Sequence, residues 1–591
     1  MTKARVAGVG MMRIFGMGTV LVVLNACTAN SVAPDTADKP TDNIASFDIA
    51  QRLDCSALTG MKVPAADIGL PTTGALISAA EKIPEATIKE QIVAEHCLVS
   101  GEIKPLDPSA PNIRFQIALP VMWNSKALML GGGGFEGIVP QVTGNINNTS
   151  ANSIAPLNRG YAVFGGDSGH IAPDKDPASY MTSEQGSFMT NEESWINYRG
   201  DALKKTHDAV MAVIFSAYGQ SPSQTYFIGG SASGREALVV AGRWPEDWDG
   251  VISLFPALHL VTSVLGVQHM NRALAKPGAW LNPSERGALF QAAQSACDSL
   301  DGADDGVISN IKGCYASFEP RTALLDGVAL RCPKGEDTAD TCLSDAQLEA
   351  LETLNNPFKF GFPLASGDTH YPGFYAYTSD WGIPGDTQMH QINSWLGFGT
   401  IPPAFPTAQG MTLHVSYADN FFRYGVANGD LAFNTLEIDP TKPSPYAERL
   451  SEMSTPESAD KDLTQFANKG GKLIIIQGTA DTITSPKLTE EYYEGLKETM
   501  GHKLVNKSVR FYEIHGWSHS LSTHYYAQWD YLSALENWVE ADIDPAENEV
   551  VMDGIGVPGR TRPLCMYPRW PHFDKTGDIN KAASFTCKDP W

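Results

Sequence analysis

The chain has 591 residues, of which 43% are hydrophobic and 19% are charged. This balance is typical of a folded globular protein and excludes a disordered chain or a collagen-like repeat. The formal net charge of -24 repels phosphate groups, so we expect no nucleic-acid partner and no attraction to anionic lipid headgroups.

Residues 1–26 have the pattern of a bacterial export signal. Three basic residues precede an apolar run from Ile14 to Leu24, which is too short to span a bilayer. The ending Leu24-Asn25-Ala26-Cys27 resembles a lipobox, in which Cys27 becomes the acylated first residue. We predict an exported protein, either an outer-membrane lipoprotein or a periplasmic or secreted protein. Its membrane contact would be that lipid, and a single transmembrane anchor is the remaining alternative.

Eight cysteines remain when Cys27 is set aside, an even number that favours disulfides in an exported chain. They are Cys55, Cys97, Cys297, Cys314, Cys332, Cys342, Cys565 and Cys587. Spacing alone does not choose among their many pairings, and pairing in chain order is the simplest expectation. No CxxC pair or HExxH motif occurs, which gives a zinc site little support.

The composition divides the rest of the chain into four parts. Residues 27–46 lack apolar periodicity and predict a flexible tether. Residues 47–257 and 471–591 alternate short apolar runs with helical stretches, which indicates crossover connections and a mostly parallel sheet. Residues 258–470 are rich in Pro, Gly and aromatic residues. We predict an α/β core in two parts, with a large lid domain inserted between them instead of an independent tandem domain.

The periodicity places the predicted strands and helices of this core in alternation. The predicted strands are Ile113–Leu119, Ala127–Leu130, Tyr161–Gly165, Thr225–Ile228, Asp249–Leu254, Lys472–Gln477 and Val509–Ile514. The predicted helices are Trp195–Tyr218, a helix that follows Ser231, Leu488–Met500 and Ala527–Val539.

A run of four glycines, 131–134, ends the predicted strand Ala127–Leu130. Acyl transfer requires donors aimed at an oxyanion, and backbone N–H groups of such a run are the usual source. We predict that Gly132 or Gly133 supplies one donor. A flexible linker fits poorly because apolar segments flank the run. A dinucleotide-binding loop fits poorly because no acidic residue follows at the required spacing.

The strongest pattern is Tyr226-Phe227-Ile228-Gly229-Gly230-Ser231-Ala232-Ser233-Gly234. An apolar strand runs into a tight turn and then a helix, and Ser231 stands at the tip of the turn. This is the pattern of a nucleophile elbow, and the N–H of Ala232 would be the second oxyanion donor. Ser233 stands where the G-x-S-x-G consensus has its last glycine. The alternative is a Gly- and Ser-rich turn that merely packs tightly.

Between the two parts of the core, the sequence Cys297-Asp298-Ser299-Leu300-Asp301-Gly302-Ala303-Asp304-Asp305-Gly306-Val307 is strongly acidic. Carboxylates at short intervals, with glycines that allow tight turns, suit Ca²⁺, which takes six to eight oxygen ligands. The terminal glutamate of an EF-hand is missing. An acidic surface turn is the alternative.

A serine nucleophile requires a base and an acid that orients the base, and α/β-hydrolases supply them in the order Ser, Asp, His. Asp481 follows the predicted strand Lys472–Gln477, and His519 follows the strand Val509–Ile514. We predict Ser231, Asp481 and His519 as a catalytic triad. Asp481 could instead be a helix cap or loop residue, His519 a surface histidine, and His515 and His524 are nearby competitors for the base.

Taken together, these motifs make the whole mature chain resemble the tannase and feruloyl esterase family, which includes bacterial mono(hydroxyethyl) terephthalate hydrolases. The similarity lies in the glycine loop 131–137, the turn at Ser231, the acidic loop, and the glycine pair in Lys469-Gly470-Gly471-Lys472-Leu473. The C-terminal blocks Arg562-Pro563-Leu564-Cys565 and Ala583-Ser584-Phe585-Thr586-Cys587 belong to it as well.

The resemblance implies an α/β-hydrolase fold and a serine esterase that cleaves esters of aromatic acids such as hydroxycinnamates, gallate or terephthalate. The expected partner is therefore a small aromatic ester, and the sequence indicates no oligomeric state. The resemblance also implies the triad Ser231, Asp481 and His519, and it implies four disulfides, Cys55–Cys97, Cys297–Cys314, Cys332–Cys342 and Cys565–Cys587. A structural Ca²⁺ in the lid would be bound by Asp298, Asp301, Asp305 and the carbonyls of Ala303 and Val307. The lid residues Trp395, Phe398, Phe421 and Arg423 would contact the acyl group, although aromatic residues at such spacing are more often lid core.

One departure from the family pattern concerns the site itself. Family members commonly carry a cysteine immediately before the nucleophile and another immediately after the histidine, joined as a disulfide. Here these positions are Gly230 and Ser520. Two rival hypotheses therefore remain beside the esterase: a non-catalytic aromatic-ester-binding lipoprotein, and an acyltransferase or amidase with the same triad.

Overall fold

The computed structural model describes residues 54–589 except 89–90, 151, 174–183, 456–460 and 547–548. The predicted export signal, the tether and Cys27 lie outside the described residues. Residues 51–591 pack as one compact unit. Within the described residues, no helix is both long and apolar enough to cross a lipid bilayer.

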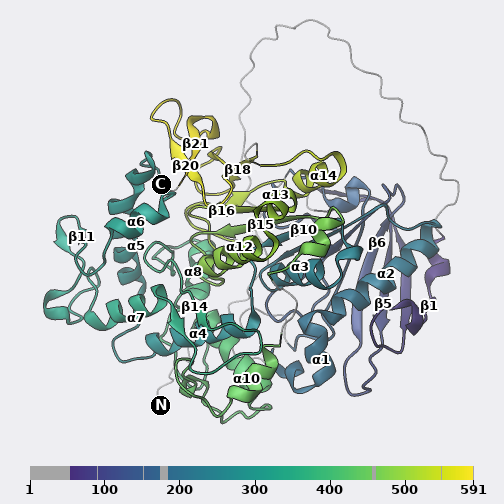
Figure 1. The fold of residues 1–591 in the computed structure, drawn as a ribbon, viewed down its shortest axis with the longest axis horizontal. Coiled ribbons are helices and arrows are strands. Elements are labelled where there is room, and N and C mark those ends of the chain that lie inside the picture. Colours follow the sequence, from purple (N-terminus) through teal and green to yellow (C-terminus); the bar gives the residue numbers. More distant parts are fainter. Residues whose placement is uncertain are drawn as a thin grey trace, which may run out of the picture. The chain divides into compact units, whose positions relative to one another are not determined.

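A ten-stranded sheet, which runs through the centre of Figure 1, organises this unit. Its strands, in spatial order, are β1 Lys62–Val63, β2 Ala75–Ile83, β5 His96–Ile103, β6 Ile113–Pro120, β8 Ala162–Gly166, β7 Lys126–Leu130, β9 Gln224–Gly230, β10 Gly250–Leu254, β15 Lys472–Gly478 and β16 Val509–Ile514. The pairs from β1 to β8 are antiparallel, and those from β8 to β16 are parallel. The predicted mostly parallel α/β sheet is confirmed. The predicted strand β6, however, pairs antiparallel with both neighbours, and β1, β2 and β5, which the sequence does not predict, extend the sheet beyond it.

Both faces of the parallel strands are buried, which explains their nearly continuous apolar sequences. In β15, Leu473 and Ile475 pack into one core cluster, while Ile474 and Ile476 pack into another. The first cluster receives α2 Ala202–Tyr218, α3 Ala232–Arg243 and α12 Pro486–Met500, and the second receives α14 Tyr531–Ala541. The carboxyl ends of the parallel strands therefore project from a rigid, two-sided core.

Two predicted helices differ in extent from those in the structure. The stretch predicted as one helix from Trp195 consists of α1 Glu192–Ile196, a π-helical turn η5 Asn197–Asp201, and α2. The interruption lies at Gly200, whose φ of 141° excludes a regular helix. The helix predicted from Ala527 begins at Tyr531, because the Asp530 side chain caps it by accepting from the N–H of Ser533.

Between β10 and β15, no described residue adds a strand to the large sheet. This segment, coloured teal to green in Figure 1, lies at the opposite side of the view from β1 and β5. Its helices are α4 Leu260–Leu274, α5 Pro283–Cys297, α6 Ile311–Ser317, α7 Asp345–Asn355, α8 Gln388–Leu396, α9 Leu413–Asn420, α10 Ala447–Met453 and α11 Thr464–Asn468. Its hairpins pair β11 Leu324–Leu325 with β12 Val328–Ala329 and β13 Phe358–Lys359 with β14 His370–Tyr371. The exact limits of the lid stay a prediction.

The remaining elements surround the sheet. They are β3 Ala86–Ile88, β4 Gln91–Val93, α13 His502–Ser508, β17 Ala527–Gln528, β18 Val550–Asp553, β19 Thr561–Pro563, β20 Trp570–Phe573 and β21 Phe585–Lys588, with short 3-10 turns between them. The C-terminal hairpin β20–β21 reaches the acidic loop, because a side chain on Gly302 would lie 2.7 Å from the carbonyl oxygen of Phe573.

Four disulfides close loops in the described chain, and their pairing is the one implied by the family resemblance. They are Cys55–Cys97, Cys297–Cys314, Cys332–Cys342 and Cys565–Cys587. Cys297–Cys314 brackets the acidic loop, and Cys565–Cys587 ties β21 to the chain that follows β19.

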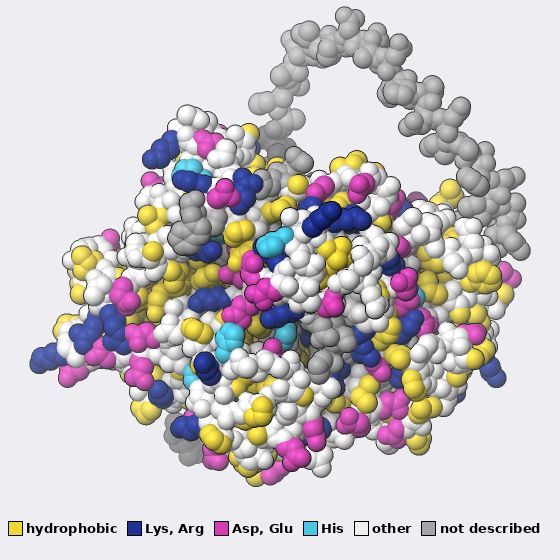
Figure 2. All heavy atoms as spheres, in the orientation of Figure 1, with side chains coloured by type: hydrophobic (Ala, Val, Ile, Leu, Met, Phe, Trp, Pro, Cys, Tyr) yellow, Lys and Arg dark blue, Asp and Glu magenta, His cyan; other side chains and the backbone are white. Residues whose placement is uncertain are grey.

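Charged side chains of both signs cover the face shown in Figure 2, where Lys and Arg lie among Asp and Glu. Basic residues do not gather into one patch on this face.

Candidate active site

Ser231 lies between β9 and α3, at the carboxyl edge of the parallel sheet. Its φ of 63° and ψ of -121° are strained for a residue with a side chain, as expected for a nucleophile elbow. Small neighbours make the turn possible, because a Cβ on Gly229 would lie 2.1 Å from the carbonyl oxygen of Ser233. A Cβ on Gly234 would likewise lie 2.4 Å from the carbonyl oxygen of Leu254. The turn presents the Ser231 hydroxyl outside the strand.

The structure brings the three predicted triad residues together. Nε2 of His519 lies 2.9 Å from Oγ of Ser231, and Nδ1 of His519 lies 2.9 Å from Oδ2 of Asp481. A carboxylate only accepts, so the His519 Nδ1–H donates to Asp481 and leaves Nε2 free to accept from Ser231. His519 and Asp481 come from the loops after β16 and β15, so neighbouring strands fix their spacing.

Asp481 is fully buried, and no Lys or Arg among the described residues forms an ion pair with it. Its charge is stabilised by hydrogen bonds instead. Oδ1 accepts from the N–H groups of Ile483 and Thr484 at 2.7 and 2.9 Å. Oδ2 accepts from the Thr484 hydroxyl at 2.8 Å and from Gln477 Nε2 at 3.1 Å. These bonds fix which oxygen faces His519.

The two competing histidines lie elsewhere. His515 is buried, and desolvation lowers its pKa to about 3, so its imidazole stays neutral. His524 bonds through Nδ1 to the hydroxyl of Thr523 at 2.7 Å, and its nearest carboxylate is Asp380 at 4.0 Å. Among the described residues, His519 alone has a ring nitrogen within hydrogen-bond distance of Ser231.

The glycine run lies beside the elbow and offers free backbone donors. The Gly131 N–H donates to the carbonyl of Ile228 at 3.0 Å, which docks the run on β9. Within the described chain, the N–H groups of Gly132, Gly133 and Ala232 have no acceptor. Gly132, Gly133 and the Ser231 turn also line the same cavity. The predicted donors are thus available where an oxyanion would form.

Ser233, at the position of the last consensus glycine, has a definite role in this arrangement. Its fully buried hydroxyl lies 2.6 Å from the carbonyl oxygen of Gly132, to which it donates, and accepts from the N–H of Gly230 at 2.9 Å. The hydroxyl therefore ties the elbow to the glycine run.

The cavity in front of Ser231 has a volume of about 680 Å³. Apolar side chains from α4 and the preceding loop, including Leu260, Val264 and Val267, form one wall. Asn145, Tyr417 and His414 add polar groups, and burial lowers the pKa of His414 to about 4, so it too is uncharged. No Lys, Arg, Asp or Glu occurs among the described residues that line this cavity.

Of the four lid residues expected to contact the acyl group, only Trp395 lines the cavity. Phe398 is fully buried and stacks on Trp381, with ring centroids 4.6 Å apart. Phe421 is also fully buried, in contact with Trp195 and Phe422. Arg423 is held by Asp419 at 2.8 Å. The expectation is therefore corrected for these three, because core packing and an ion pair hold them away from the cavity.

Phe255 occupies the space where a bridge beside the triad would pass. A Cβ on Gly230 would lie 2.9 Å from the Phe255 ring, so a cysteine there would collide with it. The ring packs edge-on against His519, with centroids 4.7 Å apart.

Asn148 holds the chain on the other side of His519. Its Nδ2 donates to the carbonyl of Ser520 at 2.7 Å, and the Ser520 hydroxyl donates to Oδ1 of Asn148 at 3.4 Å. Asn148 is itself buried, with its own carbonyl bonded to the N–H of Trp529. Hydrogen bonds and Phe255 together position His519 in the absence of a bridge. No local pattern indicates the role of Asn148, because the contact spans 372 residues.

Replacing Asn148 with glycine is expected to lower kcat about 10- to 100-fold with little change in KM, because misplacing a catalytic group by about 1 Å costs this much. Glycine accepts the positive φ of 57° at this position, so the change removes the side-chain bonds without straining the backbone. Steady-state kinetics on an aromatic ester measure the effect. Asn428→Gly is the matched control, since Asn428 is exposed and has a φ of 49°. Equal kcat values in both variants would show that Asn148 does not position His519.

The acidic loop has the charge of a cation site, but its carboxylate oxygens lie farther apart than the ligands of one bound ion. Asp301 is buried with an exposed fraction of 1%, and desolvation raises its pKa to about 7. No described Lys or Arg pairs with Asp298 or Asp301, whereas Asp305 pairs with Arg562. The ligand oxygens of the three aspartates do not all lie within 4.8 Å of one another. Ala303 and Val307, whose carbonyls would complete the set, are buried beside them.

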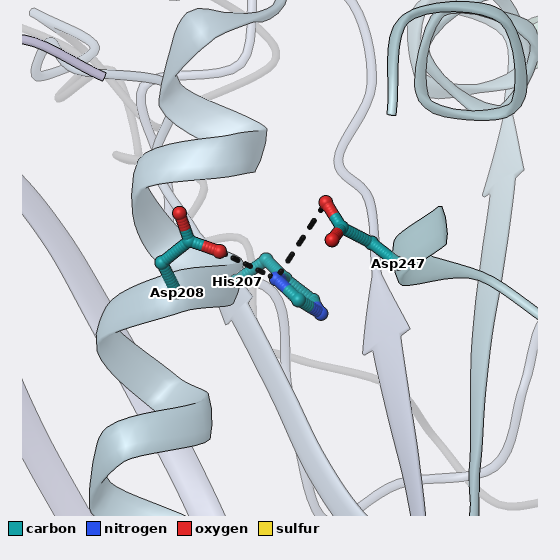
Figure 3. A group of neighbouring side chains, drawn as sticks. All are labelled: His207, Asp208 and Asp247. Atoms are coloured by element: carbon teal, nitrogen blue, oxygen red, sulfur yellow. Dashed lines mark hydrogen bonds and ion pairs between the residues drawn. The ribbon is translucent and has the colours of Figure 1, made fainter. Parts of the chain in front are cut away.

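One group of side chains has metal-ligand spacing among the described residues: His207 and Asp208 of α2, with Asp247 (Figure 3). Nδ1 of His207 lies 2.9 Å from Asp208 and 3.9 Å from Asp247. The ammonium of Lys204 already lies between the two carboxylates, at 2.8 and 2.9 Å. The Lys204 ammonium is thus the cation that this group binds. Its two ion pairs link α2 to the turn after α3.

The fold and the site are those of the α/β-hydrolase class: a serine at a strand-to-helix turn, with an acid and a histidine following in that order. Residues 97–588 match the sequence profile of the family described as tannase and feruloyl esterase. The chain belongs to this family.

Individual relatives agree with this assignment. An uncharacterised esterase of Agrobacterium fabrum is 35% identical over 541 residues, covering 90% of this chain and 93% of that protein. Mono(2-hydroxyethyl) terephthalate hydrolase of Piscinibacter sakaiensis is 28% identical over 587 residues, covering 92% of each. The crystal structure of feruloyl esterase B from Aspergillus oryzae superimposes with a TM-score of 0.67 at 20% identity, covering 88% of this chain and 98% of that chain. The chain is a carboxylic ester hydrolase.

Proposed function

We propose that the chain hydrolyses esters of aromatic acids that carry no second carboxylate, such as hydroxycinnamates or gallate. The reaction would proceed through an acyl-enzyme on Ser231. The observation that carries this proposal is the Ser231–His519–Asp481 chain of hydrogen bonds at the wall of a cavity lined by apolar and neutral polar groups. Family membership supports the ester bond as the target.

In the proposed mechanism, His519 Nε2 takes the proton of Ser231 while Oγ attacks the ester carbonyl. The N–H groups of Gly132 or Gly133 and of Ala232 bind the resulting oxyanion. His519 then returns the proton to the alcohol, which leaves. Water attacks the acyl-enzyme by the same route and releases the acid. Asp481 holds the imidazole in one tautomer throughout.

The side chains that line the cavity favour some of the candidate acyl groups over others. A terephthalate monoester carries a free carboxylate, and burying an unpaired charge costs several kcal/mol. The described lining offers no Lys or Arg to pair with it. Esters of hydroxycinnamates and gallate carry no second carboxylate, so the neutral lining, which includes Asn145 and Tyr417, has no unpaired charge to bury. Neutral acyl groups are therefore favoured over terephthalate monoesters.

A substrate panel tests this proposal. The purified protein is assayed with methyl ferulate, methyl gallate, mono(2-hydroxyethyl) terephthalate and bis(2-hydroxyethyl) terephthalate, the last being a neutral ester of the same acid. We expect kcat/KM for the neutral esters to exceed that for the monoester by about 100-fold, as roughly 3 kcal/mol of charge burial implies. Equal rates for the two terephthalates would refute the preference, and no hydrolysis of any ester would favour a non-catalytic binding protein. A larger yield of transferred acyl product than of free acid would instead favour an acyltransferase.

We also propose a structural Ca²⁺ bound by the carboxylates of Asp298, Asp301 and Asp305 and by the carbonyls of Ala303 and Val307. The burial of the Asp301 carboxyl without a described Lys or Arg partner supports it. The cation would secure the loop between the Cys297–Cys314 disulfide and the C-terminal hairpin. Its role is structural, with no step of the reaction assigned to it.

Removing calcium is expected to lower the thermal unfolding midpoint, because an ion that binds the folded state stabilises it by about 3 kcal/mol at 100 times its Kd. Calorimetry of the wild type in EDTA and in millimolar Ca²⁺ measures the difference. In Asp301→Asn the difference should disappear. Identical midpoints for the wild type with and without Ca²⁺ would refute the site.

We propose that the protein is exported, since four disulfides are typical of chains that fold in an oxidising compartment. Lipidation of Cys27 would anchor it to a membrane, and intact-mass measurement of the natural protein distinguishes the lipidated from the secreted form.

A further inference from the structure

The oxyanion loop, residues 131–134, is anchored at both ends. Its first residue is docked on β9, because the Gly131 N–H donates to the carbonyl of Ile228 at 3.0 Å. Its last residue, Gly134, has a carbonyl oxygen on which two tyrosine hydroxyls converge. The hydroxyl of Tyr417 lies 2.9 Å from this oxygen, and that of Tyr198 lies 3.3 Å from it. The predicted oxyanion donors of the loop lie between the two anchors.

The two tyrosines come from different parts of the fold. Tyr198 belongs to η5 and is fully buried. Tyr417 belongs to α9, in the segment between β10 and β15, and its half-buried side chain lines the cavity in front of Ser231. Their hydroxyl oxygens lie 3.4 Å apart. The lid segment therefore supplies part of the anchor of the oxyanion loop.

Tyr417 contacts the same part of the chain a second time, through its ring. The ring stacks on that of Phe135, with centroids 4.1 Å apart and planes at 7°. Phe135 directly follows Gly134, is buried, and belongs to the same core cluster as Leu260 and Val264 of α4. A hydrogen bond and a ring stack thus act on two consecutive residues at the end of the loop.

These contacts matter because four consecutive glycines have no side chains that could fix their own backbone. Glycine also has more conformational freedom than any other residue, so the position of the loop depends on its neighbours. An oxyanion donor is effective only when it is already aimed at the developing charge, and a displacement of about 1 Å costs about 100-fold in rate. A side chain that holds Gly134 in place therefore affects the rate.

We propose that Tyr417 positions the oxyanion loop, so that this lid residue contributes to the rate of acyl transfer and not only to the binding of the acyl group. The inference rests on the proposed esterase function. Tyr417 acts through Gly134 on the N–H groups that stabilise the oxyanion, which makes it a positioning residue. A residue that only formed the cavity wall would instead change KM when replaced. Kinetic measurements therefore separate the two roles.

The test begins with Tyr417→Phe, which removes the hydroxyl and keeps the ring stack. The substrate is methyl cinnamate, whose ring carries no polar group, so the missing hydroxyl cannot act through a hydrogen bond to that ring. We expect kcat to fall about 10- to 100-fold and KM to stay within about threefold, because the loop is displaced and the cavity is not. Tyr198→Phe is the second variant should Tyr417→Phe fail to fold. It removes the longer bond to the same carbonyl and should lower kcat less, again with KM unchanged.

An aryl trifluoromethyl ketone measures the binding of the oxyanion directly. Oγ of Ser231 adds to its carbonyl carbon, His519 takes the serine proton, and the carbonyl oxygen becomes an oxyanion that the N–H donors bind. An analogue of the transition state should lose affinity as the transition state does. The inhibition constant of the ketone should therefore rise in Tyr417→Phe by the factor by which kcat/KM falls.

Tyr218→Phe is the matched control. Tyr218 ends α2, its hydroxyl donates to the carbonyl of Pro120 at 2.7 Å, and its ring stacks on Trp123 with centroids 4.2 Å apart. The control therefore loses the same kind of hydrogen bond beside the same kind of stack. Because Tyr218 does not line the cavity, its replacement should leave kcat, KM and the inhibition constant unchanged.

A Tyr417→Phe variant with kcat within twofold of the wild type, or with its whole effect on KM, would overturn the proposal. An equal loss of kcat in Tyr218→Phe would overturn it as well, because loss of any such bond would then lower the activity. Failure of the wild type to hydrolyse any aromatic ester would count against the esterase function itself. The two failures are therefore distinguishable.

Discussion

Replacing Ser231 with alanine is expected to lower kcat by about 10⁶-fold on an aromatic ester, because the hydroxyl that forms the acyl-enzyme is removed. The Cβ of alanine fits the strained turn as well as that of serine does, so the elbow and the cavity remain intact. Residual activity over the uncatalysed reaction would come from the oxyanion donors and from binding alone. Steady-state hydrolysis, with a melting curve to confirm folding, measures the loss.

Ser221→Ala is the matched control for this prediction. Ser221 is exposed in the loop before β9 and lies outside the cavity lining, so its removal should leave kcat unchanged. Hydrolysis by Ser231→Ala within tenfold of the wild type would show that another residue carries the reaction.

Replacing Asp481 with asparagine is expected to lower kcat by about 10⁴-fold, although the side chains have the same shape. Oδ1 must keep accepting from the N–H groups of Ile483 and Thr484, so the new amide NH₂ faces His519. The imidazole then accepts at Nδ1 and carries its proton on Nε2. In that tautomer it cannot take the proton of Ser231.

Asp326→Asn, in an exposed turn of the lid segment, is the control for the loss of one negative charge. Hydrolysis should be unaffected in this variant. The role assigned to Asp481 would be wrong if Asp481→Asn kept more than about a tenth of the wild-type kcat. This conclusion requires that Ser231→Ala be inactive in the same assay.

The strands of the parallel sheet could be predicted because each buries both faces and reads as a short apolar run. The triad could be predicted for a related reason: each member follows such a strand, so the order of the strands brings their carboxyl ends together. The antiparallel strands β2 and β5 mix polar with apolar residues, because they are less deeply buried than the parallel strands, and such a sequence indicates a strand less clearly.

The lid residues show that a local sequence pattern does not predict which side chains face the cavity. Trp395, Phe398 and Phe421 are all aromatic residues of the lid, yet only Trp395 lines the cavity. Whether an aromatic side chain faces a ligand or a core depends on the packing of helices that are distant in sequence. Asn148 was missed for the same reason, since its partner Ser520 is distant in the sequence.

Ser233 shows that a residue can depart from a consensus motif and still fit its structure. The serine departs from the glycine of the consensus, which weakens the motif as a pattern. Its hydroxyl bonds with Gly132 and Gly230, so the substitution adds a link between the elbow and the oxyanion loop. A conformational requirement that glycine usually meets is here met by a small side chain with its own hydrogen bonds.

Covalent labelling tests most directly the claim that Ser231 is the nucleophile. The purified wild type is incubated with a fluorophosphonate, digested, and analysed by mass spectrometry alongside Ser231→Ala. The account predicts one adduct per chain, on the peptide that contains Ser231, with activity lost in proportion and no adduct in the variant. An active enzyme that stays unlabelled, or one whose inactivating adduct lies on another residue, would contradict it.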